Sequence, residues 1–236
     1  MKFVPDKIYN KWRKHFGNYE IEDPRPAAKK SPYTLYLPTQ DHLTAIEVGD
    51  QVKIIFFGKP AGLEYEAERM WVHVISRAGN KLTGRLDNNP FDMPQLSVGD
   101  IVEFMAFNII DITWHENTPR PELENLSASK NKQYWDRCFV DDCVLYDGID
   151  VQYIYREEPD MTRESDKYPD SVWRIRGNVD QMTDEQYENG TASYIALGKV
   201  LNEDNSWLHL IESSVGTAYL KNKETGVFEA TEFTGD

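Results

Sequence analysis

Two polar clusters at the ends of one predicted hairpin contain the side chains of this chain that are best placed to do chemistry. Glu68 and Arg69 come just before the strand-forming run MWVHVIS, and Asp87, Asn88 and Asn89 follow the run KLTGRL. A guanidinium group beside carboxylate and amide groups can bind a small anion or the end of a peptide. The cluster is therefore a candidate ligand site, or the site of an enzyme that no motif identifies. The same side chains can instead cap backbone N–H groups and pin the turn to the sheet, and the sequence leaves both interpretations open.

The sequence contains none of the common motifs that bind nucleotides or activate a nucleophile. The elbow pattern G-x-S-x-G and the phosphate-binding loops GxGxxG and GxxxxGK[ST] are absent. The histidines are scattered singly, without an HxxxH or HExxH spacing that would place two imidazoles on one ion. They are His15, His42, His73, His115 and His209. We therefore expect no cofactor, no bound metal and no enzymatic activity.

Neither the cysteines nor the first residues point to an extracellular protein. Cys138 and Cys143 are the only cysteines, and their spacing fits neither a disulfide framework nor a CxxC motif, so we expect two small core or edge residues. The opening MKFVPDKIYNKWRKHFG has no apolar run of signal-peptide length, and no segment approaches the roughly 20 apolar residues that span a bilayer. We expect a cytoplasmic protein.

The net charge of −14 is unevenly distributed along the chain. Residues 1–30 hold eight Lys/Arg against four Asp/Glu, residues 31–130 eight against fourteen, and residues 131–236 ten against twenty-two. Most of this surface would repel a phosphate backbone, which disfavours sequence-independent binding of nucleic acid. A basic protein partner would instead be attracted. The excess of carboxylates can also serve solubility alone.

An apolar spacing of four predicts a short helix near the start of the chain. Ile8, Trp12 and Phe16 recur at this interval, and Gly17 follows as a stop signal. This helix is a candidate arm for nucleic acid, and the alternative is a solvated basic face beside a docked aromatic residue. The stretch EDPRPAAKKSP then indicates a linker, so we assign residues 1–29 to the N-terminal helix and linker. The basic outer face of the predicted helix contains Lys7, Lys11, Arg13 and Lys14.

From residue 30 to residue 115 the apolar periodicity changes to two, which predicts strands. The runs YTLYL, QVKIIFF, MWVHVIS, KLTGRLD and IVEFMAF are short and rich in β-branched or aromatic residues. Ala78-Gly79-Asn80 provides a hairpin loop, and the two VGD triplets, at residues 48–50 and 98–100, provide tight turns before strands. The pattern indicates a small, strongly bent antiparallel sheet over residues 30–115.

A polar stretch with two prolines, ENTPRPELENLSASKNK, separates this sheet from a second domain. We place the linker at residues 116–134 and the second domain at residues 135–236. There, strand-like runs flank Tyr146-Asp147-Gly148, SVWRIRG gives a further strand, and TASYIALGKVLN has apolar residues at helical spacing. The predicted fold class is α+β, with two small domains that are each a bent antiparallel sheet with few helices.

Several features of the first domain occur together in the order of a known family pattern. The stretches GDQVKIIFF and AERMWVHVISRAGNKLTGRLDNNPFDMPQLSVGDIVEF contain an ERMWV strand, a strand end of the form Gly-x-Leu-Asp-Asn-x-Pro, and a Gly-Asp turn. They resemble the bacterial domain-of-unknown-function family 2314 over residues 30–115. The resemblance carries no catalytic residue across, because no activity is established for that family.

The second half has its own set of recognisable stretches, VQYIYREEPD, YPDSVWRIRG, YIALGKVLN and GTAYLKN. Over residues 140–231 it is similar to domain-of-unknown-function family 2185, also classed as immunity protein family 33 of bacterial polymorphic-toxin systems. The usual Asp-Ser-Gly-Trp of that family is Asp170-Ser171-Val172-Trp173 here, and its Gly-Asp-Glu is Gly177-Asn178-Val179.

The second resemblance implies a protein that binds and neutralises a toxin rather than one that catalyses a reaction. An immunity protein needs a surface complementary to its toxin, and many such toxins are basic because they attack nucleic acid. An acidic second half with exposed aromatic side chains suits this task, since carboxylates accelerate encounter and aromatic rings supply contact area. The candidate partner-binding residues are Glu157, Glu158, Asp160, Asp170 and Trp173.

Overall fold

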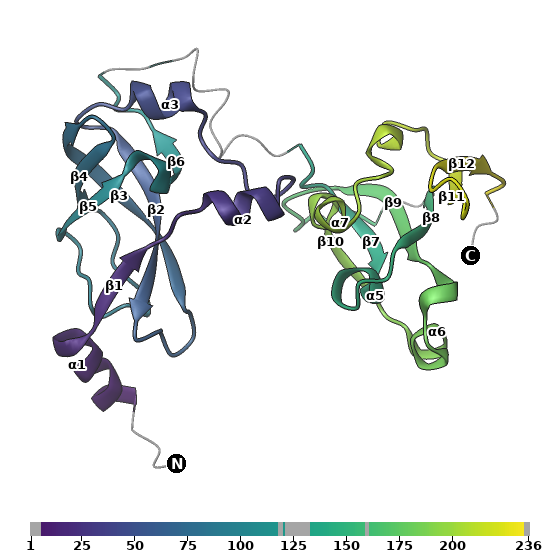
Figure 1. The fold of residues 1–236 in the computed structure, drawn as a ribbon, viewed down its shortest axis with the longest axis horizontal. Helices are drawn as coiled ribbons and strands as arrows, with labels where there is room; N and C mark the ends of the chain where they lie inside the picture. The colour runs from purple at the N-terminus through teal and green to yellow at the C-terminus, as the bar shows by residue number, and fades with distance from the viewer. Residues whose placement is uncertain (1–5, 118–119, 121–132, 159–160, 234–236) are drawn as a thin grey trace. The chain divides into compact units, whose positions relative to one another are not determined.

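The computed structural model shows an α+β chain that divides into two compact units (Figure 1). The first unit comprises residues 1–30 and 35–131, and the second comprises residues 31–34 and 132–236. Each unit contains a six-stranded sheet and a few short helices, which confirms the predicted fold class. The residues that the structure describes are 6–117, 120, 133–158 and 161–233.

The first unit is an antiparallel sheet that bends nearly into a barrel. Its strands pair in the order β1-β2-β3-β4-β5, and β6 returns to pair with β2. One end of β2 pairs with β6 and the other end with β1, so β2 connects the two margins of the sheet. The strands are β1 (Asn18–Ile21), β2 (Gln51–Lys59), β3 (Ala67–Ala78), β4 (Lys81–Leu86), β5 (Ile101–Met105) and β6 (Ile109–Thr113). The helices are α1 (Asp6–Phe16), α2 (Arg25–Lys30), α3 (Gln40–Ala45) and the 3-10 helix η1 (Ala106–Asn108).

The turns of the first unit follow the sequence prediction. Gly49 and Gly99 of the two VGD triplets adopt φ values of +100° and +92°, which favour glycine. In each triplet the aspartate that follows, Asp50 or Asp100, accepts a hydrogen bond of 2.8 Å from the backbone N–H three residues earlier. The β3–β4 hairpin turns at Gly79, as predicted. Alternate residues of the strands then face one core, as the buried side chains of β2 and β3 show: Val52, Ile54, Phe56, Val72 and Val74.

Helix α1 forms where the spacing of apolar residues predicts it, but it packs on the sheet domain by its polar side. Ile8, Trp12 and Phe16 are exposed to solvent, whereas Arg13 is completely buried. The prediction that Arg13 belongs to the basic outer face is therefore wrong, and so is the prediction that the aromatic residue of the stripe is docked. Lys7, which the prediction places on that face, is exposed.

The reason for this orientation is a buried ion pair between Arg13 and Asp92. The Arg13 guanidinium donates to the Asp92 carboxylate at 2.9 Å and to the Asp92 backbone carbonyl. The other carboxylate oxygen of Asp92 accepts from the backbone N–H groups of Glu64 (2.7 Å) and Tyr65 (3.2 Å). Charge-assisted bonds of this kind are short and directional, so they fix α1 against the loops at this end of the sheet.

We predict that the Arg13–Asp92 ion pair makes the free energy of unfolding of the first unit depend on pH in the acidic range. Burial alone would raise the pKa of Asp92, but hydrogen bonds from the Glu64 N–H, the Arg13 guanidinium and the Tyr65 N–H together hold it below the ordinary value of 3.8. Because the folded pKa is lower than the unfolded one, the carboxylate contributes stability above the unfolded pKa, and this contribution is lost as the pH falls through the folded pKa. Wild type should therefore be more stable than Asp92→Asn at neutral pH, with a difference that shrinks below pH 3.8. Urea unfolding of both proteins across this range measures it, and a difference that does not change with pH would contradict the prediction.

The second unit is a mixed sheet with a few short helices. Its strands pair in the order β10-β7-β9-β8-β11-β12. The prediction of a wholly antiparallel sheet is corrected here, because β9 inserts between β7 and β8 and runs parallel to β7. The strands are β7 (Arg137–Asp141), β8 (Val151–Arg156), β9 (Asp170–Gly177), β10 (Ala192–Ala196), β11 (Ala218–Lys221) and β12 (Phe228–Thr231). The helices are α5 (Asp142–Tyr146), α6 (Asp184–Asn189), α7 (Leu197–Glu203) and the 3-10 helices η2 (Val179–Gln181) and η3 (Leu208–Leu210).

The core of the second unit lies between the sheet and α7. Trp173 of β9 and Trp207 pack with ring centroids 5.4 Å apart, and both are almost completely buried. Cys138 and Cys143 are buried free thiols in this core, as predicted. Burial raises the pKa of the Cys138 thiol, so it stays protonated. Among the helices of the described ranges, none combines the length and the apolar character needed to cross a bilayer.

Residues 31–34 belong to the second unit although the sequence suggests that they begin the first sheet domain. The Asn202 side chain accepts a hydrogen bond from the Tyr33 N–H at 3.0 Å and donates to the Thr34 hydroxyl at 2.8 Å. The segment also runs so close to α7 that a Cβ on Gly198 would lie 2.4 Å from the Tyr33 carbonyl oxygen. Glycine is therefore required at this point of the helix.

Candidate functional site

The hairpin cluster of the first unit uses most of its polar groups on the fold itself. The two carboxylate oxygens of Glu68 accept hydrogen bonds from the backbone N–H groups of Phe91 (2.8 Å) and Asp92 (2.6 Å). The Asn88 side chain accepts from the Trp71 N–H on β3. Asp87 accepts a hydrogen bond of 2.9 Å from the Gln51 side chain. These contacts pin the turn after β4 to β3, which is the structural alternative that the sequence leaves open.

The remaining members of the cluster point into solvent. Arg69 and Asn89 are exposed. Asp87 lies beside His73, with 3.4 Å between its carboxylate and the imidazole Nε2, and no ion pair joins it to Arg69 among the residues described. The structure thus brings Glu68 to the turn and Asp87 to the opposite side of the hairpin end, so the five residues do not converge on one ligand position.

We predict that Glu68 and its neighbour Arg69 differ sharply in their importance for stability. Glu68→Ala leaves two backbone N–H groups without their acceptor, and each unsatisfied group costs about 1–3 kcal/mol when it is buried. The free energy of unfolding should fall by about 1 kcal/mol, the low end of that range, because the Phe91 N–H is exposed and the Asp92 N–H is only partly buried. Arg69→Ala is the matched control on the same strand and should change it by less than about 0.5 kcal/mol. Equal losses for the two variants in urea unfolding would contradict the assignment of Glu68 as the residue that pins the turn.

In the second unit, two of the candidate partner-binding carboxylates neutralise a buried arginine. Both carboxylate oxygens of Asp170 accept hydrogen bonds from the Arg174 guanidinium, at 3.1 and 3.0 Å, and Glu157 accepts a third at 2.8 Å. The side chains of Asp170 and Arg174 are buried. Burial alone would lower the pKa of Arg174, but Asp170 and Glu157 raise it, so the guanidinium stays charged. These two carboxylates act first as counter-ions inside the unit.

The other three candidates occupy different environments. Trp173 is a core residue, and its indole N–H donates to the Ile211 carbonyl oxygen at 3.3 Å. Glu158 is exposed, and Asp160 lies outside the described residues. Alternation along β9 explains the arrangement, because it places Trp173 on the core face and its neighbour Arg174 on the other face.

Val172, between Asp170 and Trp173, stands where the family pattern has glycine. Its backbone conformation explains the preference of the family for glycine at this position. Its φ of +58° is in the left-handed region, and it is the one residue other than glycine with positive φ in the described ranges. A side chain in this conformation costs about 1–2 kcal/mol relative to glycine. The conformation is held by a hydrogen bond of 2.9 Å from the Val172 N–H to the Asp170 carboxylate.

We predict that glycine and alanine exchange their usual order of stability at this position. In a strand, glycine is ordinarily less stable than alanine by about 0.5–1 kcal/mol. At a φ of +58° the alanine Cβ is strained, so Val172→Gly should be at least as stable as Val172→Ala in urea unfolding. The same pair of substitutions at Val140, which is buried on β7, is the control and should keep the usual order. A lower stability for Val172→Gly than for Val172→Ala would contradict the strain.

The face of this sheet opposite the core is aromatic and cationic. The Arg174 guanidinium lies 5.1 Å from the centre of the Phe139 ring. Arg176, two residues on, donates to the Asp141 carboxylate at 2.9 Å, and its second terminal nitrogen lies 3.4 Å from the Tyr155 hydroxyl. Although burial alone would lower it, Asp141 raises the pKa of Arg176, so this group is charged as well.

Two cavities hollow this face, and both have Arg176 in their walls. The smaller one, of about 230 Å³, contains Phe139, Tyr155, Glu157 and Arg174. The larger one, of about 770 Å³, extends to α5 and α6. In its wall the Tyr153 hydroxyl is buried and lacks a hydrogen-bond partner among the described residues.

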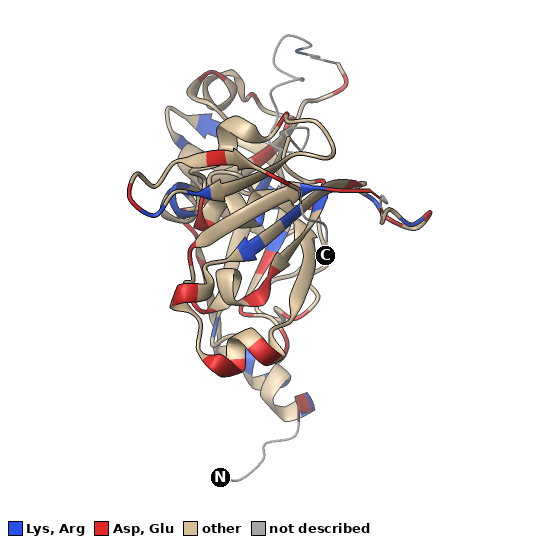
Figure 2. Ribbon diagram, turned by 90° about the vertical axis from the view of Figure 1, so that its right-hand side faces the viewer, with Lys and Arg blue, Asp and Glu red and all other residues tan. Residues whose placement is uncertain are grey.

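The rim of the larger cavity is built by the end of α5 and by the short helix α6. Thr183 and Gln186 cap α6 reciprocally, and Gln186 also donates to the Asp147 carboxylate at 2.8 Å. This bond holds Glu185 and Tyr187 at the cavity, and Tyr187 is largely exposed. The carboxylate residues of α6 are drawn in red in Figure 2.

In the wall of the same cavity, Asp142 is an ionised carboxylate with hydrogen-bond partners. It accepts hydrogen bonds from the hydroxyls of Ser193 and Thr191. These bonds hold the pKa of Asp142 below its ordinary value, so it carries a negative charge at neutral pH. In the ranges that the structure describes, no group of three His, Cys, Asp or Glu side chains could hold a metal ion. The cavity is suited to recognising polar or cationic groups.

Sequence reasoning did not single out Glu185, Arg176 or Tyr153 as site residues. The alternation along β9 could have indicated Arg176, because it shares a face with Arg174. The position of α6 beside α5 depends on the bond between Gln186 and Asp147, which are 39 residues apart. No local pattern contains that information.

The comparison with protein families finds one matching family in each half of the chain. Residues 138–232 match the family described as immunity protein Imm33 domain, which confirms the resemblance noted in the sequence. Residues 39–119 match the family described as an uncharacterized protein conserved in bacteria, DUF2314, which confirms the other resemblance. No curated protein and no solved structure matches the chain. Both cavities lie entirely within residues 138–232.

Proposed function

We propose that this chain is a non-enzymatic immunity protein whose second unit binds and neutralises a protein toxin. The observation that carries the proposal is the coincidence of two findings on one segment: the match to an immunity-protein domain, and the large cavity that the same residues enclose. Neutralisation by binding needs a complementary surface and no reactive group. The proposal places this encounter in the cytoplasm.

The rim of the larger cavity is the proposed contact surface, because its charge and its rings suit a basic partner. Asp147 and Glu185 lie in the cavity wall, and α6 adds Asp184 and Glu188, both exposed. Clustered carboxylates attract a basic protein and raise its association rate, most strongly at low ionic strength. This rim replaces the buried Asp170 as the centre of the proposed acidic interface, while the exposed Glu158 stays a separate candidate after β8.

Two exposed tyrosines supply the anchoring area that charge alone does not provide. Tyr187 and Tyr146 are each about 70% exposed, at 70% and 72%. Tyr146 ends α5 and directly precedes Asp147. Tyrosine is enriched among the residues that dominate binding energy at interfaces, because its ring buries a large area at little cost in conformational entropy. The larger cavity, which Tyr187 lines, has room for one or more side chains of the toxin.

The hydrogen bonds inside the cavity support recognition rather than chemistry. Asp141 bonds Arg176 and the Gly177 N–H, and Asp142 bonds two hydroxyls. Carboxylates that are already satisfied and ionised are poor general acids. Asp142, whose two partners are neutral hydroxyl groups, keeps a negative charge that can stabilise an arriving cation.

We predict that Tyr187→Ala and Glu185→Lys impair toxin binding in different ways. Tyr187→Ala removes an anchor and should weaken binding of the toxin encoded beside this gene by at least about tenfold, mainly through faster dissociation. Glu185→Lys should instead slow association, with an effect that diminishes as salt is added. Surface plasmon resonance with purified toxin at low and high ionic strength separates the two rates.

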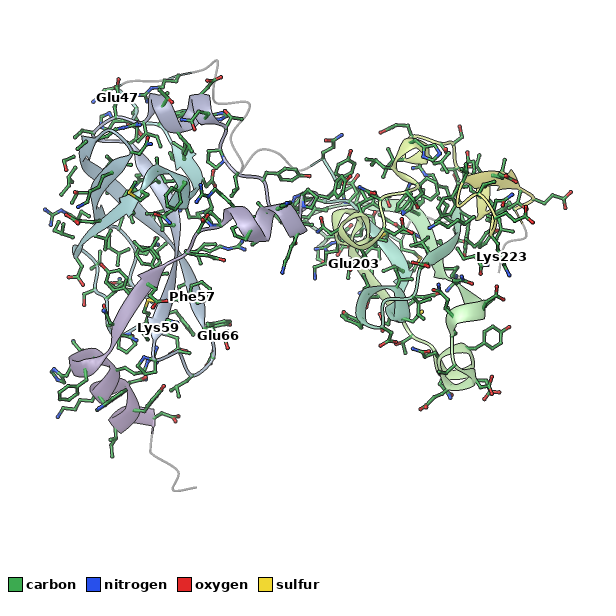
Figure 3. All side chains as sticks on the ribbon, viewed as in Figure 1. Glu47, Phe57, Lys59, Glu66, Glu203 and Lys223 are labelled. Carbon is green, nitrogen blue, oxygen red and sulfur yellow. The ribbon has the colours of Figure 1, made fainter. Side chains whose placement is uncertain are left out.

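The matched control is Glu203→Lys, which makes the same charge change on an exposed residue at the end of α7 that is not part of the cavity wall (Figure 3). It should leave both rate constants unchanged. If the wild-type chain neither binds the toxin nor protects cells on co-expression, the proposed function is wrong. If it binds and protects while the Tyr187 and Glu185 variants behave as wild type, the function stands and the proposed surface is wrong.

A further inference from the structure

Helix α1 exposes its apolar stripe instead of burying it. Ile8, Trp12 and Phe16 are 59%, 48% and 75% exposed, while the polar side of the helix is docked through Arg13. Tyr9 and Trp12 stack with ring centroids 6.4 Å apart, and Trp12 and Phe16 lie 6.2 Å apart, so the rings form one continuous surface. Each large apolar side chain left in water forgoes about 1.5–3 kcal/mol of burial free energy.

More exposed apolar residues surround the loops on which α1 is docked. The Tyr9 hydroxyl donates to the Ala61 carbonyl oxygen at 3.2 Å, which joins the helix to the loop between β2 and β3. Tyr65 in that loop packs edge to face on Phe91, with 5.9 Å between ring centroids. Figure 3 labels Glu66, which follows Tyr65, at the same end of the sheet as α1. We define the α1 patch as Ile8, Trp12, Phe16, Leu63, Tyr65 and Phe91, each between 47% and 75% exposed.

The area of the α1 patch is that of one side of a stable interface. Aromatic side chains of this size present about 150–250 Å² each when fully exposed. At the exposures found here, the six residues together leave on the order of 800 Å² in water. Specific interfaces bury about 800 Å² per partner, and an exposed apolar area of this size marks an interaction site.

The charges around the α1 patch are balanced, unlike those of the chain as a whole. Lys7, Lys11 and Lys14 are exposed on α1. Three exposed carboxylates oppose them, one at the start of the helix and two that alternate with the apolar residues of the loop: Asp6, Glu64 and Glu66. Two copies of a chain with a net charge of −14 repel each other over most of their surface. At this patch they meet without net repulsion.

We infer that the α1 patch is the contact surface between two copies of this chain. A two-fold axis brings the same patch of both copies together, so each apolar stripe covers the other. The same symmetry sets the lysines of each copy against the carboxylates of its partner, because the patch contains both signs. A purely basic helix would instead favour an acidic partner or an anionic membrane, and Glu64 and Glu66 would repel such a surface. This inference is independent of the proposed toxin binding.

Sedimentation equilibrium of the full chain tests the inference. The wild-type chain should show a concentration-dependent dimer, and Trp12→Glu combined with Phe16→Glu should raise the dissociation constant at least a hundredfold. Val48→Glu combined with Val98→Glu is the matched control, since both valines are exposed on turns of the same unit and outside the patch. It should dimerise as wild type does. All four positions are exposed, so urea unfolding should show intact folds for both variants.

Charge exchange provides a second test that does not depend on the apolar residues. One variant carries Lys7→Glu, Lys11→Glu and Lys14→Glu, and the other carries Glu64→Lys and Glu66→Lys. Each should self-associate at least tenfold more weakly than wild type, because its patch then has charges of mainly one sign. The two variants mixed together should associate again as a heterodimer.

Three results would overturn the inference. The first is a wild-type chain that stays monomeric at all concentrations, including a chain that is monomeric yet binds vesicles of phosphatidylserine and phosphatidylcholine. The second is a dimer that the Trp12 and Phe16 substitutions leave unchanged, because it would form through another surface. The third is a mixture of the two charge variants that does not associate more strongly than either variant alone.

Discussion

The guanidinium group of Arg174 joins the parts of the second unit on which the proposed interface depends. It lies on β9 and bonds Asp170 at the start of that strand and Glu157 just after β8. A buried ion pair adds little net stability, because the desolvation of the charges offsets their attraction, but loss of one partner costs about 3–5 kcal/mol. Its contribution is therefore positional. It fixes the corner between β8 and β9, and strand alternation then directs Arg176 to the wall that both cavities share.

The surplus of carboxylates in the second half is a poor guide to where the negative surface lies. Asp170 and Glu157 belong to the most acidic part of the sequence, yet their charge is directed at Arg174. Open negative charge instead gathers at α6, which has no basic residue in its last turn. A net count assigns a sign to the whole unit, whereas a partner meets only the charges that remain unpaired at the surface.

The local pattern of the sequence is sufficient to predict β2 to β5, the hairpin at Gly79 and the two turns at Gly49 and Gly99, because each depends on neighbouring residues. The run YTLYL, which the same pattern assigns to a strand, forms none in the structure. The helical spacing of Ile8 and its partners likewise predicts α1. The direction that the helix faces depends on Asp92, which lies 79 residues from Arg13 in the sequence. The spacing of apolar residues identifies one face of the helix. Whether that face is buried depends on a contact with a residue far away in the sequence, which the spacing does not reveal.

The same limit applies to the candidate site. The resemblance to an immunity-protein family was recognisable from short stretches, and the match over residues 138–232 agrees with it. The cavity was not predictable, since it forms where α6 meets α5 through Gln186 and Asp147. The parallel pairing of β7 with β9 was hidden for a similar reason, because β9 inserts between two strands that precede it in the chain.

The two hydrogen bonds that join Asn202 to Tyr33 and Thr34 constrain the order in which the chain can assemble. The second unit takes its first four residues from a segment that precedes the DUF2314 match at residue 39. Tyr33 and Asn202 are 169 positions apart, so the ribosome makes five of the six strands of the first sheet, β2 to β6, between the two halves of this contact. The strands of the first unit can pair before α7 is synthesised, at a stage when residues 31–34 lack their contact with that helix. The second unit can therefore be completed only after α7 has been synthesised. It then packs around residues 31–34, which were made before most of the first unit.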